Sequence, residues 1–405
     1  MKKLSFLVLS ALLMASCCHQ EQAIDIKIVN DSYLDRQQET VEFHMEALYE
    51  ALGCQDGDSL VVFNAAGEEI PSQVLSNSCH SKHFIFQANV PAMDSAFYTI
   101  KVGHPSEYPC QAQATFMPRR KDDMSWENDR AIYRMYGPAL VTDPDEGMVS
   151  GGLDVWVKRT REMVSQKWYQ DEFDGKSSYH NDNGEGLDFY SVGTTLGAGA
   201  MAPYIDGKLW KVGSNFKTYT ILENGPIRTS FQLDYDAYDV NGKQISEHRL
   251  ITLDAGSYLN RIVVLYEGND EEMTVAAGFP FRGFTGVEDS ENLGINDCAD
   301  IMYSLEDNRI AYAEPETENG IIFLGSILTT PSTGMLIADG HVLNCTTLEA
   351  GTPIMYYSGG AWSKDGFQSL SAWDTYLSDY ATQIQQPLKV SIVEHCCCGD
   401  KDCQE

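Results

Sequence analysis

A histidine, three carboxylates and a tyrosine lie between His180 and Tyr190, within the segment Tyr179–Gly193. His180, Glu185, Asp188 and Tyr190 are groups that can exchange a proton or orient a neighbour that does so. Two glycines between His180 and Tyr190 allow a sharp turn or a close approach to a ligand. We therefore name these four residues as catalytic candidates, with His180 and Tyr190 as base and acid. The alternative is a polar surface loop with acidic residues at a turn.

Two arginines lie in the segment Trp126–Gly137. If this segment is one strand, Asn128, Arg130 and Arg134 point to the same face. A guanidinium group binds a carboxylate or sulfate through two parallel hydrogen bonds, so these residues are candidates for substrate binding. The alternative is that the arginines form ion pairs with Asp or Glu of neighbouring strands.

Two further segments each supply a cation. Lys158 follows Asp154-Val155-Trp156-Val157 and would neutralise a bound acid or remain a solvated charge at a strand end. Trp362 and Lys364 follow a Gly-Gly pair, and a partly exposed tryptophan on such a loop offers a flat apolar face to a sugar ring. Lys158, Trp362, Lys364 and Trp126 complete the predicted substrate-binding set.

Composition and missing motifs exclude several functions. With 28 Lys and Arg against 59 Asp and Glu, the formal net charge of −31 would repel nucleic acid and anionic lipid. The sequence contains no G-x-S-x-G, H-E-x-x-H, P-loop or dinucleotide-binding motif. No cofactor is expected and no metal ligand is named, while a structural Ca²⁺ is left open.

Residues 1–17 are typical of a lipoprotein signal peptide. Two lysines precede an apolar run, Leu4–Met14, and a small-residue cleavage site ends at Cys17. The run is too short to span ~30 Å of hydrocarbon, so we expect cleavage, acylation of Cys17 and attachment to the cell envelope by lipid alone. The alternative is an ordinary secretory signal with an incidental cysteine.

The remaining cysteines are scattered or gathered in a tail. Export permits disulfides, and Cys54 with Cys79 is the best pairing, although the sequence does not fix it. Residues 396–405 contain three adjacent cysteines and Cys403. Adjacent cysteines do not readily converge on one tetrahedral ion, so we predict a disordered, oxidisable tail.

The rest of the chain predicts an all-β protein of two units. Residues 22–118 carry short alternating strands typical of a small antiparallel sandwich, and a charged segment after Pro118 marks the boundary. Residues 125–395 form the second unit, a large antiparallel sheet system. The tight-turn dipeptides in it are Asp206-Gly207, Asn224-Gly225 and Asn241-Gly242.

Two segments of the second unit carry helical rather than strand spacing. They are Val157–Tyr169 and Ser369–Gln385, and the second has Leu370, Trp373 and Leu377 on one face. We therefore expect one or two peripheral helices against the sheets.

The chain resembles a family of secreted Bacteroidota proteins known as domain-of-unknown-function family 4861. The resemblance rests on Trp126-Glu127-Asn128-Asp129-Arg130 with Tyr133-Arg134 and Tyr136-Gly137, Asp154 to Lys158, Tyr179 to Gly193, Asp254-Ala255-Gly256-Ser257 with Leu259-Asn260-Arg261, and Gly359 to Lys364. It implies a β-supersandwich of the galactose-mutarotase type in the large unit, and a setting in the breakdown of plant glycans rich in uronic acids. Fold alone does not assign a catalytic role to any residue.

These observations together predict a carbohydrate-active lipoprotein that acts on uronate-containing oligosaccharides, as a lyase or a hydrolase. In β-elimination, Arg130, Arg134 or Lys158 would neutralise the uronate carboxylate, and His180 or Tyr190 would transfer protons. Glu185 and Asp188 would orient them or form the carboxylate pair of a hydrolase. The alternatives are a non-catalytic glycan-binding protein and a sugar mutarotase or epimerase.

Overall fold

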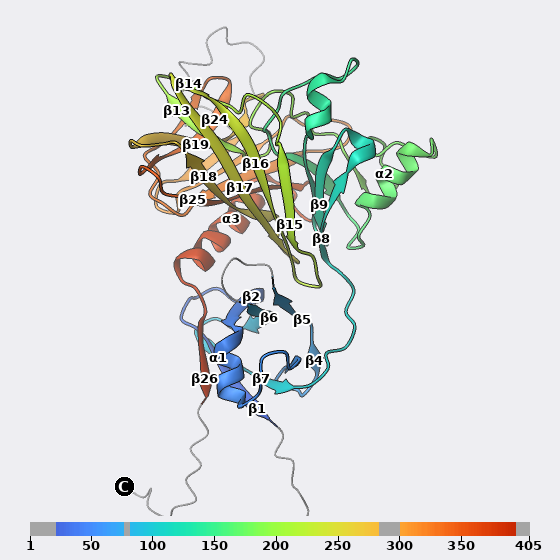
Figure 1. The fold of residues 1–405 in the computed structure, drawn as a ribbon, viewed down its shortest axis with the longest axis vertical. Coiled ribbons are helices and arrows are strands. Elements are labelled where there is room, and N and C mark those ends of the chain that lie inside the picture. Colours follow the sequence, from blue (N-terminus) through green and yellow to red (C-terminus); the bar gives the residue numbers. More distant parts are fainter. Residues whose placement is uncertain (1–21, 77–81, 283–299, 394–405) are drawn as a thin grey trace, which may run out of the picture.

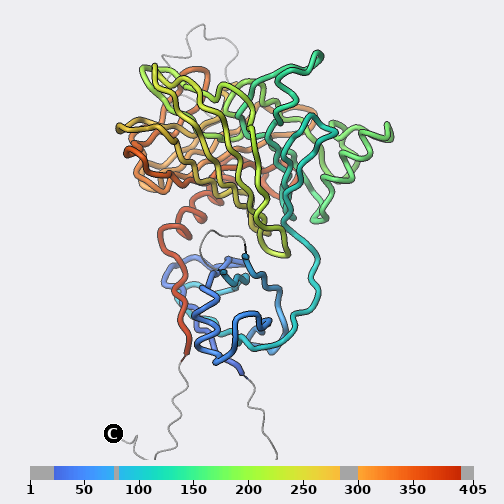
Figure 2. Tube along the Cα trace, in the orientation of Figure 1, coloured from blue at the N-terminus to red at the C-terminus, as the bar shows by residue number. Residues whose placement is uncertain are grey.

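The computed structural model describes residues 22–76, 82–282 and 300–393. Figures 1 and 2 show a smaller unit, built mainly from the first part of the chain, beside a larger one. Strands dominate both units, and their ladders are antiparallel. The predicted fold class, all-β with a small sandwich, a large antiparallel sheet system and peripheral helices, is confirmed.

The smaller unit is a sandwich of two sheets. One sheet has the strand order β26 (Lys389–Val393), β1 (Ala23–Asn30), β7 (Asp94–Val102), β3 (Leu60–Phe63) and β4 (Glu69–Ile70), and the other has β2 (Arg36–His44), β6 (His83–Val90) and β5 (Ser72–Leu75). Every second residue of β1 is buried, so Ile24, Ile26 and Ile28 enter the core. This period of two is what the sequence analysis relied on for this unit.

One helix of the smaller unit was not predicted. Strand β2 ends at His44, and α1 (Met45–Leu52) follows directly. Met45, Leu48 and Leu52 recur at helical spacing and are buried, and Gly53 ends the helix with φ 65°. The alternation in the preceding strand concealed the start of this helix.

The larger unit contains three sheets around one apolar core. The eight-stranded sheet has the order β15 (Thr218–Glu223), β16 (Arg228–Val240), β17 (Lys243–Asp254), β18 (Leu259–Glu267), β25 (Ile354–Trp362), β22 (Ile322–Leu328), β21 (Arg309–Ala313), β20 (Ile301–Ser304). The second sheet has β14 (Lys208–Leu209), β13 (Met201–Ile205), β19 (Met273–Pro280), β24 (His341–Leu348), β23 (Gly334–Ala338). The third has β12 (Gly186–Leu187), β11 (Asp154–Lys158), β10 (Ala131–Met135), β9 (Asp123–Asn128), β8 (Ala112–Met117). One buried cluster takes side chains from all three, among them Phe231, Phe279 and Tyr133.

Two of the three predicted tight turns are confirmed. Asp206-Gly207 and Asn241-Gly242 have positive φ at both positions and join adjacent strands. Asn224-Gly225 is a wider connection, in which the Asn224 side chain accepts a hydrogen bond from the Ala114 backbone at 2.7 Å. Here the asparagine ties the loop to β8 instead of closing a hairpin.

The helix prediction was correct for the C-terminal segment and partly wrong for the other. α3 (Leu370–Gln385) begins at Ser369, whose side chain accepts a hydrogen bond from the Ala372 backbone, and buries Trp373 and Leu377. The helix predicted over Val157–Tyr169 is wrong at its start, because Asp154–Lys158 is strand β11 and α2 is Ser165–Phe173. None of the helices in the described ranges is long and apolar enough to cross a membrane.

The chain passes between the units twice. After α3, strand β26 pairs with β1, with Val393 opposite Asp25. The second unit was predicted to extend to residue 395, whereas this last strand lies in the sheet of the first; the division into two units stays a prediction. At the junction Leu75 and Ile85 pack on Ile227.

Candidate functional site

Arg130 and Arg134 do not share one strand face, so that prediction is wrong. β9 and β10 form a hairpin, and Asn128 closes its turn by accepting hydrogen bonds from the Arg130 and Ala131 backbone at 2.8 and 3.0 Å. Arg130 lies on the turn and pairs with Asp129 at 3.1 Å. Asparagine favours this type of turn because its side chain replaces a backbone acceptor.

Arg134 lies at the centre of a buried polar network in the larger unit. Its guanidinium donates to Asp154 at 2.7 Å and to Asp188 at 3.3 Å, and its side chain is only 4% exposed. Asp188 also lies 3.6 Å from Nδ1 of His180. The structure therefore brings together three predicted residues, His180, Asp188 and Arg134, through one shared carboxylate.

Burial sets the protonation of this network. Burial, and then the charge of Asp154, raises the pKa of Asp188 well above its usual value. Burial likewise raises the pKa of Asp123 to about 6, although Arg134 opposes the shift. His180 is 58% exposed, so its imidazole is accessible, and its Nδ1 is hydrogen-bonded to the Asp188 backbone carbonyl at 3.0 Å.

Tyr190 belongs to a second group, formed with two residues that the sequence analysis did not name. Arg282 lies over the Tyr190 ring at 5.2 Å and donates to Glu314 at 3.0 Å. Tyr190 and Glu314 are both buried, and within the described chain the Tyr190 hydroxyl and Oε1 of Glu314 have no hydrogen-bond partner. Burial raises the pKa of both groups. A phenol, a carboxyl group and a guanidinium side by side can transfer protons near an anionic group.

Glu185 lies apart from these groups and does not orient His180. Its carboxylate accepts hydrogen bonds from Lys167 at 2.8 Å and from the Trp168 indole at 2.9 Å. The Lys167 hydrogen bond, followed by that from Trp168, lowers the pKa of Glu185. Glu185 therefore fixes α2 to the segment before β12.

Lys158 is an internal structural cation, and the expectation that it meets a substrate or solvent is wrong. Its ammonium group donates to Glu127 at 2.6 Å and to the Asn128 carbonyl at 2.8 Å, and its side chain has no exposed surface. The same Glu127 carboxylate accepts from the Val164 and Ser165 backbone at the start of α2. The pair thus joins β9, β11 and α2.

Trp126 and Asn128 are buried and hold a turn of the neighbouring sheet. The Trp126 indole donates to Asn260 at 2.7 Å, and the Asn128 amide donates to the Asp254 and Ser257 carbonyls, each at 2.7 Å. Neither side chain can stack on a ligand, since both are 0% exposed. They act on function only by positioning the turn 254–260.

Trp362 is also buried, so the prediction of an exposed stacking ring is wrong. It is the last residue of β25, is 1% exposed, and donates from its indole to the Asn319 carbonyl at 2.8 Å. The Gly-Gly pair lies within the strand instead of in a loop, because the glycines allow close packing against β22 and β18. Lys364 is exposed and donates to the Glu318 carbonyl at 3.2 Å.

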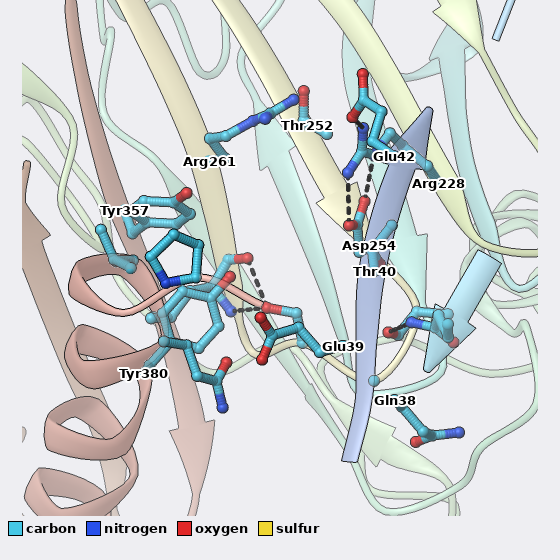
Figure 3. Close-up of a pocket in the computed structure, with 18 of the residues that line it drawn as sticks. Gln38, Glu39, Thr40, Glu42, Arg228, Thr252, Asp254, Arg261, Tyr357 and Tyr380 are labelled. Carbon is cyan, nitrogen blue, oxygen red and sulfur yellow. Dashed lines mark hydrogen bonds and ion pairs between the residues drawn. The ribbon is translucent and has the colours of Figure 1, made fainter. Parts of the chain in front are cut away.

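A pocket of about 410 Å³ lies between the two units, next to the turn 254–260. Its walls are strands β16, β17, β18 and β25 of the large sheet, helix α3 and strand β2 of the smaller unit, and Figure 3 shows their residues around the pocket. Its polar lining includes Glu39, Glu42, Asp254, Arg228, Arg261, Tyr357 and Tyr380. The sequence analysis gave none of these a role; the signal that could have found them is the motif Asp254 to Arg261, which supplies residues to one wall.

Several predicted residues lie outside the described residues. They are Cys17 with the rest of the signal peptide, Cys79 as partner of Cys54, and the tail 396–405. The lipid anchor, the disulfide and the tail therefore stay predictions. Within the described ranges no group of three or more His, Cys, Asp or Glu side chains is arranged to hold a metal ion.

Comparison with protein families accounts for most of the chain. The model of "Domain of unknown function (DUF4861)" matches residues 28–390. The chain belongs to this family. Uncharacterized protein P7 of Formosa agariphila is 28% identical over 406 residues, covering 96% of this chain and 98% of P7.

The fold is similar to part of larger enzymes. A glycosyl hydrolase family 38 protein from Enterococcus faecalis superposes with a TM-score of 0.51 at 11% identity, over 93% of this chain and 48% of that one. An alpha-mannosidase from Enterococcus faecalis V583 gives the same TM-score and identity, with coverage of 92% and 46%. The DUF4861 chain spans about half the length of these structures, and at this identity the likeness is one of fold.

Proposed function

We propose that this DUF4861 protein is a carbohydrate-active lipoprotein of the cell envelope that acts on uronate-containing oligosaccharides by acid–base chemistry. The observation that supports it is the group Tyr190, Glu314 and Arg282, where a hydroxyl and a carboxylate oxygen are buried without a described partner beside a guanidinium. Unpaired buried polar atoms are unfavourable, so such a group is a candidate for ligand chemistry.

β-Elimination is the reaction for which each of these side chains has a role. Arg282 would neutralise the uronate carboxylate, which makes the C5 proton acidic. Oε1 of Glu314 would remove that proton as the C4–O bond breaks and the C4–C5 double bond forms. Tyr190 would give its proton to the leaving oxygen and recover one from protonated Glu314, so no oxidant or reductant is needed.

This proposal moves the anion-binding role from Arg134 and Lys158, which are buried, to Arg282, whose side chain is 30% exposed while it donates to Glu314 and to the Ser191 carbonyl. His180, held by Asp188, remains a candidate for proton transfer because its imidazole is exposed. In a hydrolase the same acids and bases would activate water instead.

The proposal is tested with purified protein and oligosaccharides from pectin, glucuronan and arabinogalactan. A lyase raises the absorbance of unsaturated products, and a hydrolase releases reducing ends without that absorbance. If neither signal appears with any substrate, catalysis is contradicted. A ligand recovered unchanged after calorimetry would then identify a non-catalytic binding protein.

The lipid anchor is tested separately. Labelling of cells with a fatty-acid analogue should mark the native protein and not the Cys17→Ala variant. Label on both proteins would contradict acylation at Cys17.

A further inference from the structure

The pocket between the units contains an arginine whose hydrogen-bond donors are unused. Within the described residues Arg261 makes no hydrogen bond or ion pair, and Figure 3 shows its side chain among the pocket-lining groups without a bonded partner. An arginine carries five N–H donors and retains its charge at all accessible pH values. Arg261 therefore offers a fixed positive group with open donor positions.

The sheet register explains where Arg261 points. On the three adjacent strands β17, β18 and β25, Thr252 lies opposite Arg261, and Arg261 lies opposite Tyr357. Directly opposed residues of antiparallel strands project from the same face, so these three side chains form one row. All three line the pocket. The row combines a hydroxyl, a guanidinium and an aromatic ring, which suits a polyhydroxylated ring with an anionic substituent.

The other charged groups of the pocket are already paired. Arg228 donates to Asp254 at 2.6 and 2.9 Å and to Glu42 at 2.9 Å, which joins the two units. Burial opposes ionisation of Glu42 and Asp254, yet Arg228, with a smaller contribution from the charge of Arg261, lowers the pKa of both carboxyl groups. Glu39 accepts from Arg36 at 2.8 Å. These pairs leave Arg261 as the charged group of the lining that makes no hydrogen bond or ion pair in the described residues, although its charge acts on Glu42 and Asp254.

The remaining walls combine aromatic and amide surface. α3 supplies Tyr376 and Tyr380, and the Tyr380 ring packs edge-on against Tyr357 at 5.3 Å. The smaller unit supplies Gln38, which lies in a bulge of β2 and has φ 52°. Bulges and left-handed backbone at residues other than glycine are concentrated near functional sites, because they redirect side chains.

We propose that this pocket binds a sugar residue that carries a carboxylate or sulfate group, with Arg261 as the receptor of that group. The volume of about 410 Å³ lies in the range of ~300–1,000 Å³ common for small-ligand pockets. That the ligand is a sugar rests on the proposed function. That it carries an anionic group is inferred from Arg261 alone. Binding here does not require that the chemistry occur at Tyr190.

The test is calorimetry on the full chain with methyl glucuronoside, methyl galacturonoside, their neutral methyl glycosides and glucose 6-sulfate. The anionic sugars should bind and the neutral ones at least tenfold more weakly, because only the former can use the guanidinium fork. If only glucose 6-sulfate binds, the group is a sulfate; if only the uronosides bind, it is a carboxylate. Equal binding of neutral and anionic sugars, or no binding of any, overturns the proposal.

Variants locate the binding. R261M should weaken the anionic sugars at least tenfold and leave the neutral ones unchanged, and R261K should fall between, since lysine keeps the charge and loses the fork. R119M, which removes an exposed arginine stacked on Phe173, is the matched control and should bind as the native protein does. An unchanged affinity in a folded R261M, with an unchanged melting temperature, overturns the proposal. If R261M loses affinity for the anionic sugars while the native protein turns over no oligosaccharide, the proposed enzyme is contradicted and the binding site at Arg261 is supported.

Discussion

Arg134 and Arg261 both lie on strands of the larger unit, near carboxylates and aromatic rings, yet they have opposite surroundings. Arg134 is bonded to Asp154 and Asp188 and stacked on Trp156 at 4.9 Å, whereas Arg261 has no bonded partner among the described residues. One arginine stabilises the interior and the other faces a pocket. Residue type and spacing identified the first, but the number of donors already in use distinguishes a site from a structural pair.

The largest expected effect concerns the chemistry proposed for Tyr190 and Glu314. Tyr190→Phe and Glu314→Gln should each lower kcat about 10²–10⁴-fold, the usual contribution of a general acid or base, with KM changed less. R261M should show the reverse, a raised KM with kcat retained. Steady-state kinetics on one uronate oligosaccharide separate the two, and equal loss of kcat in all three variants would contradict separate roles.

The acid limb of the pH profile sharpens this prediction. Burial raises the pKa of Glu314 above its ordinary value, and a base must be ionised, so activity should rise with pH through that raised pKa. Glu314→Gln should remove the limb from the residual rate. If the rise of activity with pH persists in Glu314→Gln, a group other than Glu314 is responsible for it.

The next effect concerns stability. Arg134→Met should lower the free energy of unfolding by about 3–5 kcal/mol, since it leaves the buried Asp154 carboxylate without its cation. R261M should stay within about 1 kcal/mol of the native protein. Urea unfolding followed by tryptophan fluorescence measures both, and similar values for the two variants would remove the distinction between them.

A smaller effect is expected for Asp188→Asn, about 1 kcal/mol or less, because the raised pKa of Asp188 already favours the uncharged form. With the pKa higher in the folded than in the unfolded state, the native form binds more protons, so stability falls as pH rises above the unfolded value. The asparagine variant should lack this slope. Urea midpoints measured from pH 4 to 8 check it, with the native protein as reference.

The smallest effect is expected at Lys364. Its side chain is exposed, donates to a carbonyl and lies over the Trp362 ring at 5.6 Å, so Lys364→Ala should change stability by less than ~0.5 kcal/mol and leave sugar binding intact. A tenfold loss of uronate affinity in this variant would place the binding surface at the end of β25 instead of between the units.

The sequence by itself determined the elements with a clear period or a local signal. The pairs Asp206-Gly207 and Asn241-Gly242 located two turns, and helical spacing over Ser369–Gln385 located α3. These features depend on residues within one or two turns of the chain, so they can be recognised without tertiary information.

Only the tertiary structure decided which polar residues are available to a ligand. Trp126, Lys158 and Trp362 have types suited to sugar binding, but partners far along the chain bury them, such as Asn260 for Trp126 and Asn319 for Trp362. Arg261 and Glu314 look ordinary in the sequence, and their open positions arise from strand register and from burial against distant segments. Long-range pairing sets both burial and hydrogen-bond satisfaction, and neither can be read from local spacing.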